Sequence, residues 1–130
     1  MKSNFLSVVV NFGEAAGKFM DNKIQIFRNI LSDIESHPSK GWLYLPVERN
    51  WNLDSKCAIL ESDEVPPELE DDPNAGVPDF AKQNMLVEAL PITVVKDIVW
   101  NARGQRANVK LEDLLMAFQY YYKHDAFIAL

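Results

Sequence analysis

The sequence has one cysteine, two histidines and no compact motif of the kind that marks a common catalytic site. The single cysteine, Cys57, excludes an internal disulfide and suits a reducing compartment. Structural zinc sites need clusters of Cys and His, which are also missing. The composition is 48% hydrophobic, so the chain can fold by burying apolar surface without a metal or a disulfide.

The chain also lacks a run of about 18 apolar residues, the minimum for a helix that spans a membrane. The best candidate covers residues 5–12, but Ser7 and Asn11 interrupt it, and Glu14 and Lys18 follow soon after. A secretory signal needs a longer unbroken apolar region. We therefore expect a soluble, cytoplasmic protein that does not contact a membrane.

The 130 residues suit a single domain. Apolar residues at three- and four-residue spacing predict helices, and short β-prone runs between turn residues predict strands. The expected helices cover residues 3–20, 22–36, 92–103 and 110–123, and the expected strands cover residues 42–45, 57–60 and 85–90. A strand at Val8–Val10 is the alternative for the first helix, and a helix start is the alternative for residues 85–90. The fold class is α+β, with a small antiparallel sheet of about three strands packed with three to four helices.

Local signals predict where these helices begin and end. Asn22 and Gln25 have the spacing of a capping box, in which each side chain satisfies a free backbone amide at the helix start. Thr93 is the expected N-cap of the third helix, and Gly104 is its expected stop. The apolar tail, residues 126–130, is expected to pack against the domain.

The charge of the chain is concentrated in one stretch, from Glu61 to Asp79. This stretch has eight acidic residues, four prolines and no Lys, Arg or His. Outside it, thirteen Lys and Arg face eleven Asp and Glu, so the rest of the chain carries +2 although the whole carries −6. We expect an acidic, proline-rich loop over residues 61–79 that projects from one end of the sheet. A concentrated negative field attracts basic partners and repels nucleic acid.

The other polar residues give little support for a catalytic site. Cys57 lies in an apolar strand run, where a buried, unreactive thiol is expected, and His37 and His124 lie at helix ends. Asp54 and Glu61 have no Lys or His at a diagnostic spacing, and the acidic stretch lacks the ligand spacing of an EF-hand. We predict no catalytic residue, no cofactor and no metal site.

The aromatic residues divide between core and surface. Trp42 and Trp100 are expected in the core, because a stacking platform for nucleic-acid bases would need a basic groove. Tyr120 and Tyr121 lie off the main apolar face of the last helix, and exposed tyrosines often anchor protein interfaces.

The acidic stretch has two interpretations. It is either a solvated loop that aids solubility or a docking surface whose carboxylates pair with the Lys and Arg of a basic protein. Prolines favour docking, because they restrict the loop and reduce the entropy lost on binding. The candidate partner-binding residues are Asp63, Glu64, Glu68, Glu70, Asp71, Asp72, Tyr120 and Tyr121.

Five short segments between Ile24 and the C-terminus carry a resemblance to a known family. They are Gly41–Pro46 (GWLYLP), Trp51–Asp54 (WNLD), Ile98–Arg103 (IVWNAR), Leu111–Phe118 (LEDLLMAF) and Tyr120–Phe127 (YYYKHDAF). With the acidic run, they resemble the immunity proteins of contact-dependent growth inhibition and related polymorphic toxin systems. The resemblance implies a single immunity-type domain over residues 1–130, not an enzyme, that neutralises the C-terminal toxin domain of a cognate effector. Such toxins are often nucleases that cleave tRNA or other RNA.

No residue role comes with this resemblance, because an immunity surface is particular to its toxin. The docking role of the acidic loop is an inference from charge alone. Two alternatives stay open: an acidic mimic of nucleic acid that binds a host DNA-binding protein, and a small enzyme of unknown activity.

Overall fold

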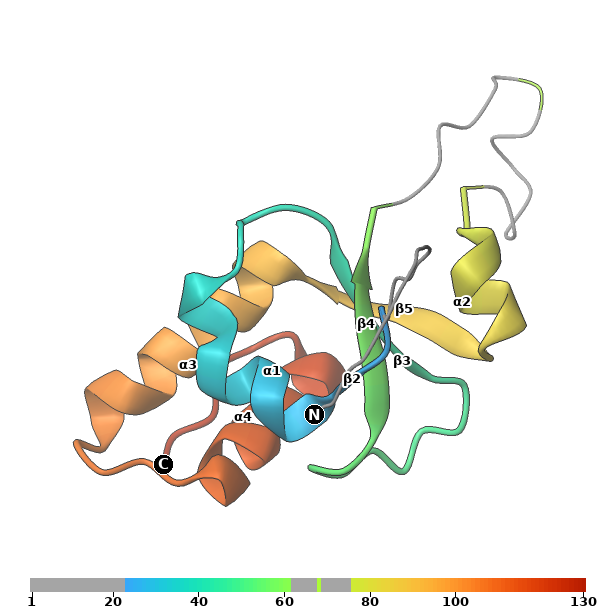
Figure 1. The fold of residues 1–130 in the computed structure, drawn as a ribbon. Coiled ribbons are helices and arrows are strands. Elements are labelled where there is room, and N and C mark those ends of the chain that lie inside the picture. The colour runs from blue at the N-terminus through green and yellow to red at the C-terminus, as the bar shows by residue number, and fades with distance from the viewer. Residues whose placement is uncertain (1–22, 62–67, 69–75) are drawn as a thin grey trace, which may run out of the picture.

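The computed structural model describes residues 23–61, 68 and 76–130 (Figure 1). The predicted helix over residues 3–20 lies outside these residues. In chain order the elements are β2 (Gln25–Ile26), α1 (Phe27–Asp33), the 3₁₀ turn η2 (Ile34–Ser36), β3 (Trp42–Pro46), β4 (Lys56–Leu60), α2 (Asp79–Gln83), β5 (Leu86–Pro91), α3 (Ile92–Gln105) and α4 (Leu111–His124).

The strands form one antiparallel sheet in the order β2-β4-β3-β5. Leu43 of β3 faces Ile59 of β4, β5 pairs with the other side of β3, and β2 pairs with the other side of β4. The expected pairing of the runs at 42–45 and 57–60 is therefore confirmed, as is the α+β class. The described residues form four strands rather than about three, because β2 was not expected.

Alternating residues of the strands give the sheet two buried faces. One face presents Leu43, Leu45 and Cys57 to a core shared with α1, α3 and α4. The other presents Tyr44, Ala58 and Leu60, together with Leu86, to a smaller cluster closed by Ala81 of α2. Figure 1 shows this arrangement, with α2 on one side of the strands and the other helices on the opposite side.

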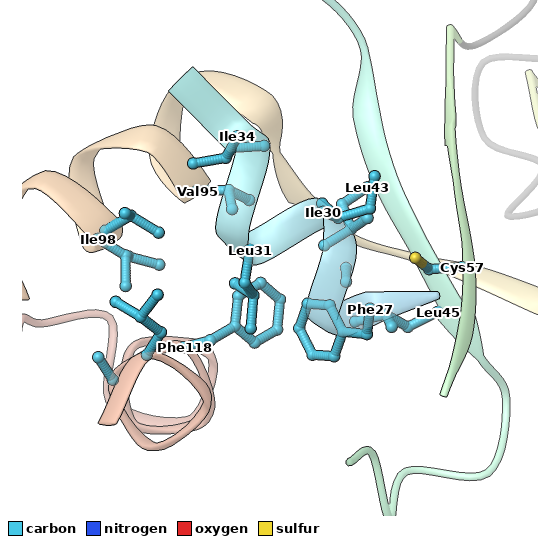
Figure 2. Close-up of a cluster of buried hydrophobic side chains, with 14 of the residues drawn as sticks. Phe27, Ile30, Leu31, Ile34, Leu43, Leu45, Cys57, Val95, Ile98 and Phe118 are labelled. Carbon is cyan, nitrogen blue, oxygen red and sulfur yellow. The ribbon is translucent and has the colours of Figure 1, made fainter. Parts of the chain in front are cut away.

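Two phenylalanines lie at the centre of the helical layer (Figure 2). The ring centroids of Phe27 in α1 and Phe118 in α4 are 4.9 Å apart at an interplanar angle of 80°, an edge-to-face contact. Trp51 adds a second edge contact to Phe118, at 6.1 Å. Both phenylalanine side chains are completely buried, so they join the first helix of the described residues to the last.

A β-bulge directs the chain from the sheet into this helical layer. Leu43 pairs with Leu90, but Tyr44 pairs with Glu88, which leaves Ala89 as an extra residue in β5. Because of this extra residue, Ala89 and Leu90 both pack against the helical core. The bulge therefore places the end of β5, and with it the start of α3, on the side of α1 and α4.

The predicted capping box at Asn22 and Gln25 is wrong. Gln25 pairs with Cys57 in β2, and α1 begins only at Phe27. The first amides of α1 are satisfied by the loop before β4 instead. The amide of Phe27 donates to the carbonyl of Ser55 and that of Arg28 to the carbonyl of Leu53, both at 2.9 Å. The predicted end near Ser36 is confirmed, because η2 ends there.

The helix predicted over residues 92–103 is confirmed as α3, Ile92–Gln105, but its predicted N-cap and its predicted stop are wrong. Pro91, not Thr93, is the N-cap of α3, and the amide of Ile92 donates to the carbonyl of Gly41 at 3.0 Å. Gly104 lies inside α3, which continues to Gln105. The tail explains this extension, because the Gln105 amide group bonds the backbone of Ile128 and Leu130, each at 2.8 Å. The expected packing of the tail is thereby confirmed.

The last helix agrees with the prediction, whereas the end of the acidic stretch does not. The helix predicted at 110–123 is confirmed as Leu111–His124, and the Asp113 carboxylate accepts a bond from the Lys110 amide at 3.0 Å. Asp79 is the first residue of α2, a five-residue helix that was not expected. The acidic stretch thus ends inside a helix rather than in a loop.

Two glycines provide a matched test of this backbone. Gly41 has a φ of +85°, and a Cβ there would lie 2.9 Å from the Leu60 carbonyl oxygen, whereas a Cβ on Gly104 would meet nothing within 4 Å. We expect Gly41→Ala to lower the free energy of unfolding by more than about 1 kcal/mol. We expect Gly104→Ala to raise it by about 0.5–1 kcal/mol, because alanine is the better helix former. Urea denaturation measures both, and equal effects of the two substitutions would contradict the described backbone.

Candidate protein-docking surfaces

The acidic stretch joins the end of β4 to the start of α2. The two residues that flank it, Leu60 and Phe80, belong to or pack against the cluster on the α2 face of the sheet. Figure 1 shows the last residues of β4 and the first of α2 at the same end of the sheet. The chain that connects them therefore starts and finishes on one side of the molecule.

Among the predicted docking residues of this stretch, the structure describes only Glu68, whose side chain is exposed. The other five, Asp63, Glu64, Glu70, Asp71 and Asp72, lie outside the described residues. Their docking role stays a prediction from the sequence.

Two lysines lie at the root of the acidic stretch. The Lys40 ammonium is 3.6 Å from the Glu61 carboxylate, and the Lys23 ammonium lies 5.5 Å from the ring centroid of Phe80. These residues help to line a hollow of about 510 Å³, to which Ile59 and Leu60 also contribute. Because both members of the Lys40–Glu61 pair are exposed, the pair stabilises the fold by at most about 1 kcal/mol. Because Lys40 already pairs with Glu61, we expect Glu61 to bind a basic partner less strongly than an unpaired acid would.

A second candidate surface is the outward face of α4. Met116 and Tyr120 lie one helical turn apart and are 46% and 37% exposed. His124 follows one turn later, with its ring centroid 4.3 Å from that of Tyr120. Exposed Met and Tyr side chains are enriched in protein interfaces. This stripe therefore has the composition of a docking surface, and it contains one of the two predicted tyrosines.

Tyr121, the other predicted tyrosine, has a different environment. Its side chain is half-buried against the helical core, and its ring centroid is 5.3 Å from that of Phe127 in the tail. Most of its contacts are therefore internal to the domain.

The sheet separates α4 from the two ends of the acidic stretch. Both ends of the acidic stretch lie on the α2 face, whereas α4 packs on the opposite face. The sequence could not place α4 relative to these ends, because their separation depends on the strand order and on which face each helix covers.

Two of the residues considered for catalysis, Cys57 and Asp54, have described surroundings. Burial raises the pKa of the Cys57 thiol to about 12, so the thiol stays protonated at neutral pH, and its sulfur lies 3.5 Å from the Gln25 carbonyl oxygen. Asp54 is in an ion pair with Arg28 at 2.7 Å. Within the described ranges, no group of three or more His, Cys, Asp or Glu side chains is placed to hold a metal ion. The helices described there are also too short or too polar to cross a membrane.

The prediction that Trp100 lies in the core is wrong. Its side chain is 73% exposed on α3, while Trp42 is half-buried against the α2-face cluster as expected. The buried stripe of α3 consists of Ile92, Val95, Ile98, Val99 and Ala102. At 100° per residue, Trp100 falls outside this stripe, so the helical period could have identified it as exposed.

The adjacent tyrosines of α4 offer a direct comparison. We expect Tyr121→Ala to lower the free energy of unfolding by about 1–3 kcal/mol, because it removes contacts with the core and with Phe127. We expect Tyr120→Ala to change it by less than about 0.5 kcal/mol, as for most exposed positions. Thermal or urea unfolding of the two variants measures this difference. A larger loss for Tyr120→Ala would show that the α4 stripe is part of the fold rather than a free surface.

Comparison with known proteins gives one family match. A family model with the description Domain of unknown function (DUF7716) matches residues 24–130, which is most of the chain and covers every described element from β2 to α4. No curated protein and no solved structure matches the chain. The chain therefore belongs to the DUF7716 family.

Proposed function

We propose that this protein is a cytoplasmic immunity protein that binds and neutralises the C-terminal toxin domain of a cognate contact-dependent growth inhibition effector. The observation that carries the proposal is the charge of residues 61–79, where eight acidic side chains occur with no basic residue. The described acids within it, Glu61, Glu68 and Asp79, are all exposed. The resemblance of five segments to immunity proteins is the reason why we propose this class of protein.

The chemistry of the partner follows from this charge. A nuclease toxin binds phosphates through Lys and Arg, and carboxylates can form the same charge-assisted hydrogen bonds with those side chains. An acidic segment that covers the toxin's basic surface would exclude its RNA substrate. Complementary charge would also accelerate association, toward about 10⁸ M⁻¹ s⁻¹ at low salt. Rapid capture suits an inhibitor that must act before its toxin cleaves RNA.

The position of the tyrosines limits how such a partner would bind. Because the sheet separates α4 from the ends of the acidic stretch, a single flat interface centred on the α2 side would not include Tyr120. We therefore assign the primary contact to Asp63, Glu64, Glu68, Glu70, Asp71 and Asp72. Tyr120 is assigned to a peripheral contact that a partner reaches only by extending around the domain, and Tyr121 contributes by holding α4 in place.

The experiment replaces these six acids with Asn or Gln and measures binding to the toxin domain encoded immediately upstream, at several salt concentrations. We expect the six-residue variant to bind at least about 100-fold more weakly, which corresponds to roughly 0.5 kcal/mol for each lost charge contact. We also expect its affinity to depend less on salt, because fewer screened contacts remain.

A matched control neutralises three exposed acids elsewhere: Asp33→Asn, Glu48→Gln and Glu112→Gln. This control changes the net charge but keeps the acidic stretch, so binding should stay within a few-fold of the unaltered chain. Unchanged toxin binding and unchanged protection of cells by the six-residue variant would refute the docking role of the acidic stretch. Capture of a host DNA-binding protein in place of the toxin domain would favour the nucleic-acid mimic.

A further inference from the structure

The hollow at the root of the acidic stretch already holds two cations of the chain itself. The Lys40 ammonium lies 3.6 Å from the Glu61 carboxylate, and the Lys23 ammonium lies 5.5 Å from the ring centroid of Phe80. All four residues line the same hollow of about 510 Å³. A carboxylate and an aromatic ring are therefore available together to a positively charged side chain that enters this hollow.

Neither internal contact holds its lysine tightly. The side chains of Lys40 and Glu61 are 72% and 64% exposed, and their separation of 3.6 Å is too long for a hydrogen bond. Lys23 is exposed as well, and the ion pairs of the described residues do not include it. Contacts between exposed charges are weak, so a cation that fits better can displace either lysine.

An arginine side chain suits this hollow better than a lysine does. A planar guanidinium bonds a carboxylate through two parallel N–H groups and stacks on aromatic rings, whereas an ammonium acts as a point charge. The methylene stem of an arginine also packs on apolar side chains. The other residues that line the hollow are apolar, namely Pro38, Ile59, Leu60 and Pro78.

The two lysines do not make this region basic. Their charges are balanced by Glu61 and by Asp79, which directly precedes Phe80, is exposed and is absent from the ion pairs of the described residues. The stretch from Glu61 to Asp79 adds six further acids, its eight less these two, and no basic residue. The local field therefore favours a cation over an anion.

We propose that this hollow receives an arginine side chain of the basic partner, which displaces Lys40 from Glu61 and Lys23 from the ring of Phe80. This rests on the proposed function, because it names the side chain that the toxin places at the root of the acidic stretch. The acids attract any cation, whereas the ring and the apolar lining favour arginine over lysine. Glu61 and Phe80 are thus further docking residues, and the two lysines compete with the partner.

The test titrates the full chain with two peptides of equal charge, hexa-arginine and hexa-lysine with blocked ends, in a calorimeter. Hexa-arginine should bind more tightly than hexa-lysine. Phe80→Leu keeps an apolar side chain but removes the ring, so it should weaken hexa-arginine binding about two- to fivefold and reduce this preference. Phe127→Leu is the matched control, because Phe127 is 47% exposed, lies in the C-terminal tail and does not line the hollow.

The competing lysine provides a test in the opposite direction. Lys40→Gln should tighten hexa-arginine binding, by up to about fivefold, because Glu61 then has no internal cation to lose. Lys123→Gln changes the net charge equally at an exposed position in α4 and should have a smaller effect. The gain from Lys40→Gln should disappear when Glu61→Gln is added. Equal gains for the two lysine variants, or an arginine preference that survives Phe80→Leu, would overturn the proposal.

The peptides also separate this proposal from the docking of the toxin. If the variant that lacks the six acids loses toxin binding while Phe80→Leu and Lys40→Gln change nothing, the acidic stretch docks the toxin and the arginine site is wrong. If that variant keeps its toxin binding while the peptide results hold, the hollow binds arginine and only the toxin assignment fails.

Discussion

The edge-to-face contact between Phe27 and Phe118 is the constraint on which the helical side of this domain depends. The two rings are completely buried, with centroids 4.9 Å apart, and they come from the first and last helices of the described residues. α1 alone is too short to be stable in water, so its position depends on tertiary contacts of this kind. Trp51 extends the contact to the segment between β3 and β4, which also supplies the carbonyls that satisfy the first amides of α1.

The two-sided sheet determines how function can be distributed over this domain. One face is covered by α1, α3 and α4 and the other by α2, and both ends of the acidic stretch lie on the α2 side. The two ends of the acidic stretch and the exposed face of α4 are therefore on different sides of the sheet. A substitution on the exposed face of α4 therefore leaves both ends of the acidic stretch unaltered, so the two candidate surfaces can be tested independently.

Local pattern predicted much of the fold, and non-local pairing accounts for most of what it missed. β3, β4 and α4 follow from apolar runs with clear periods and clear stops. β2 has only two residues, and its strand conformation depends on pairing with Lys56 and Cys57. The limits of α3 depend on Gly41 and on the C-terminal tail, which are distant in sequence. Composition alone identified the acidic stretch, but the position of its two ends relative to α4 required the topology. The exposure of Trp100 was readable from the helical period and was overlooked because tryptophan is usually buried.

Substitution of Phe118 tests most directly whether this core holds the domain together. Phe118→Ala removes the ring that joins α4 to α1 and Trp51, and we expect it to lower the free energy of unfolding by about 3–5 kcal/mol. Met116→Ala, in the same helix but 46% exposed, should lower it by less than about 1 kcal/mol. Urea denaturation followed by circular dichroism measures both. A Phe118→Ala variant no less stable than Met116→Ala would contradict the account.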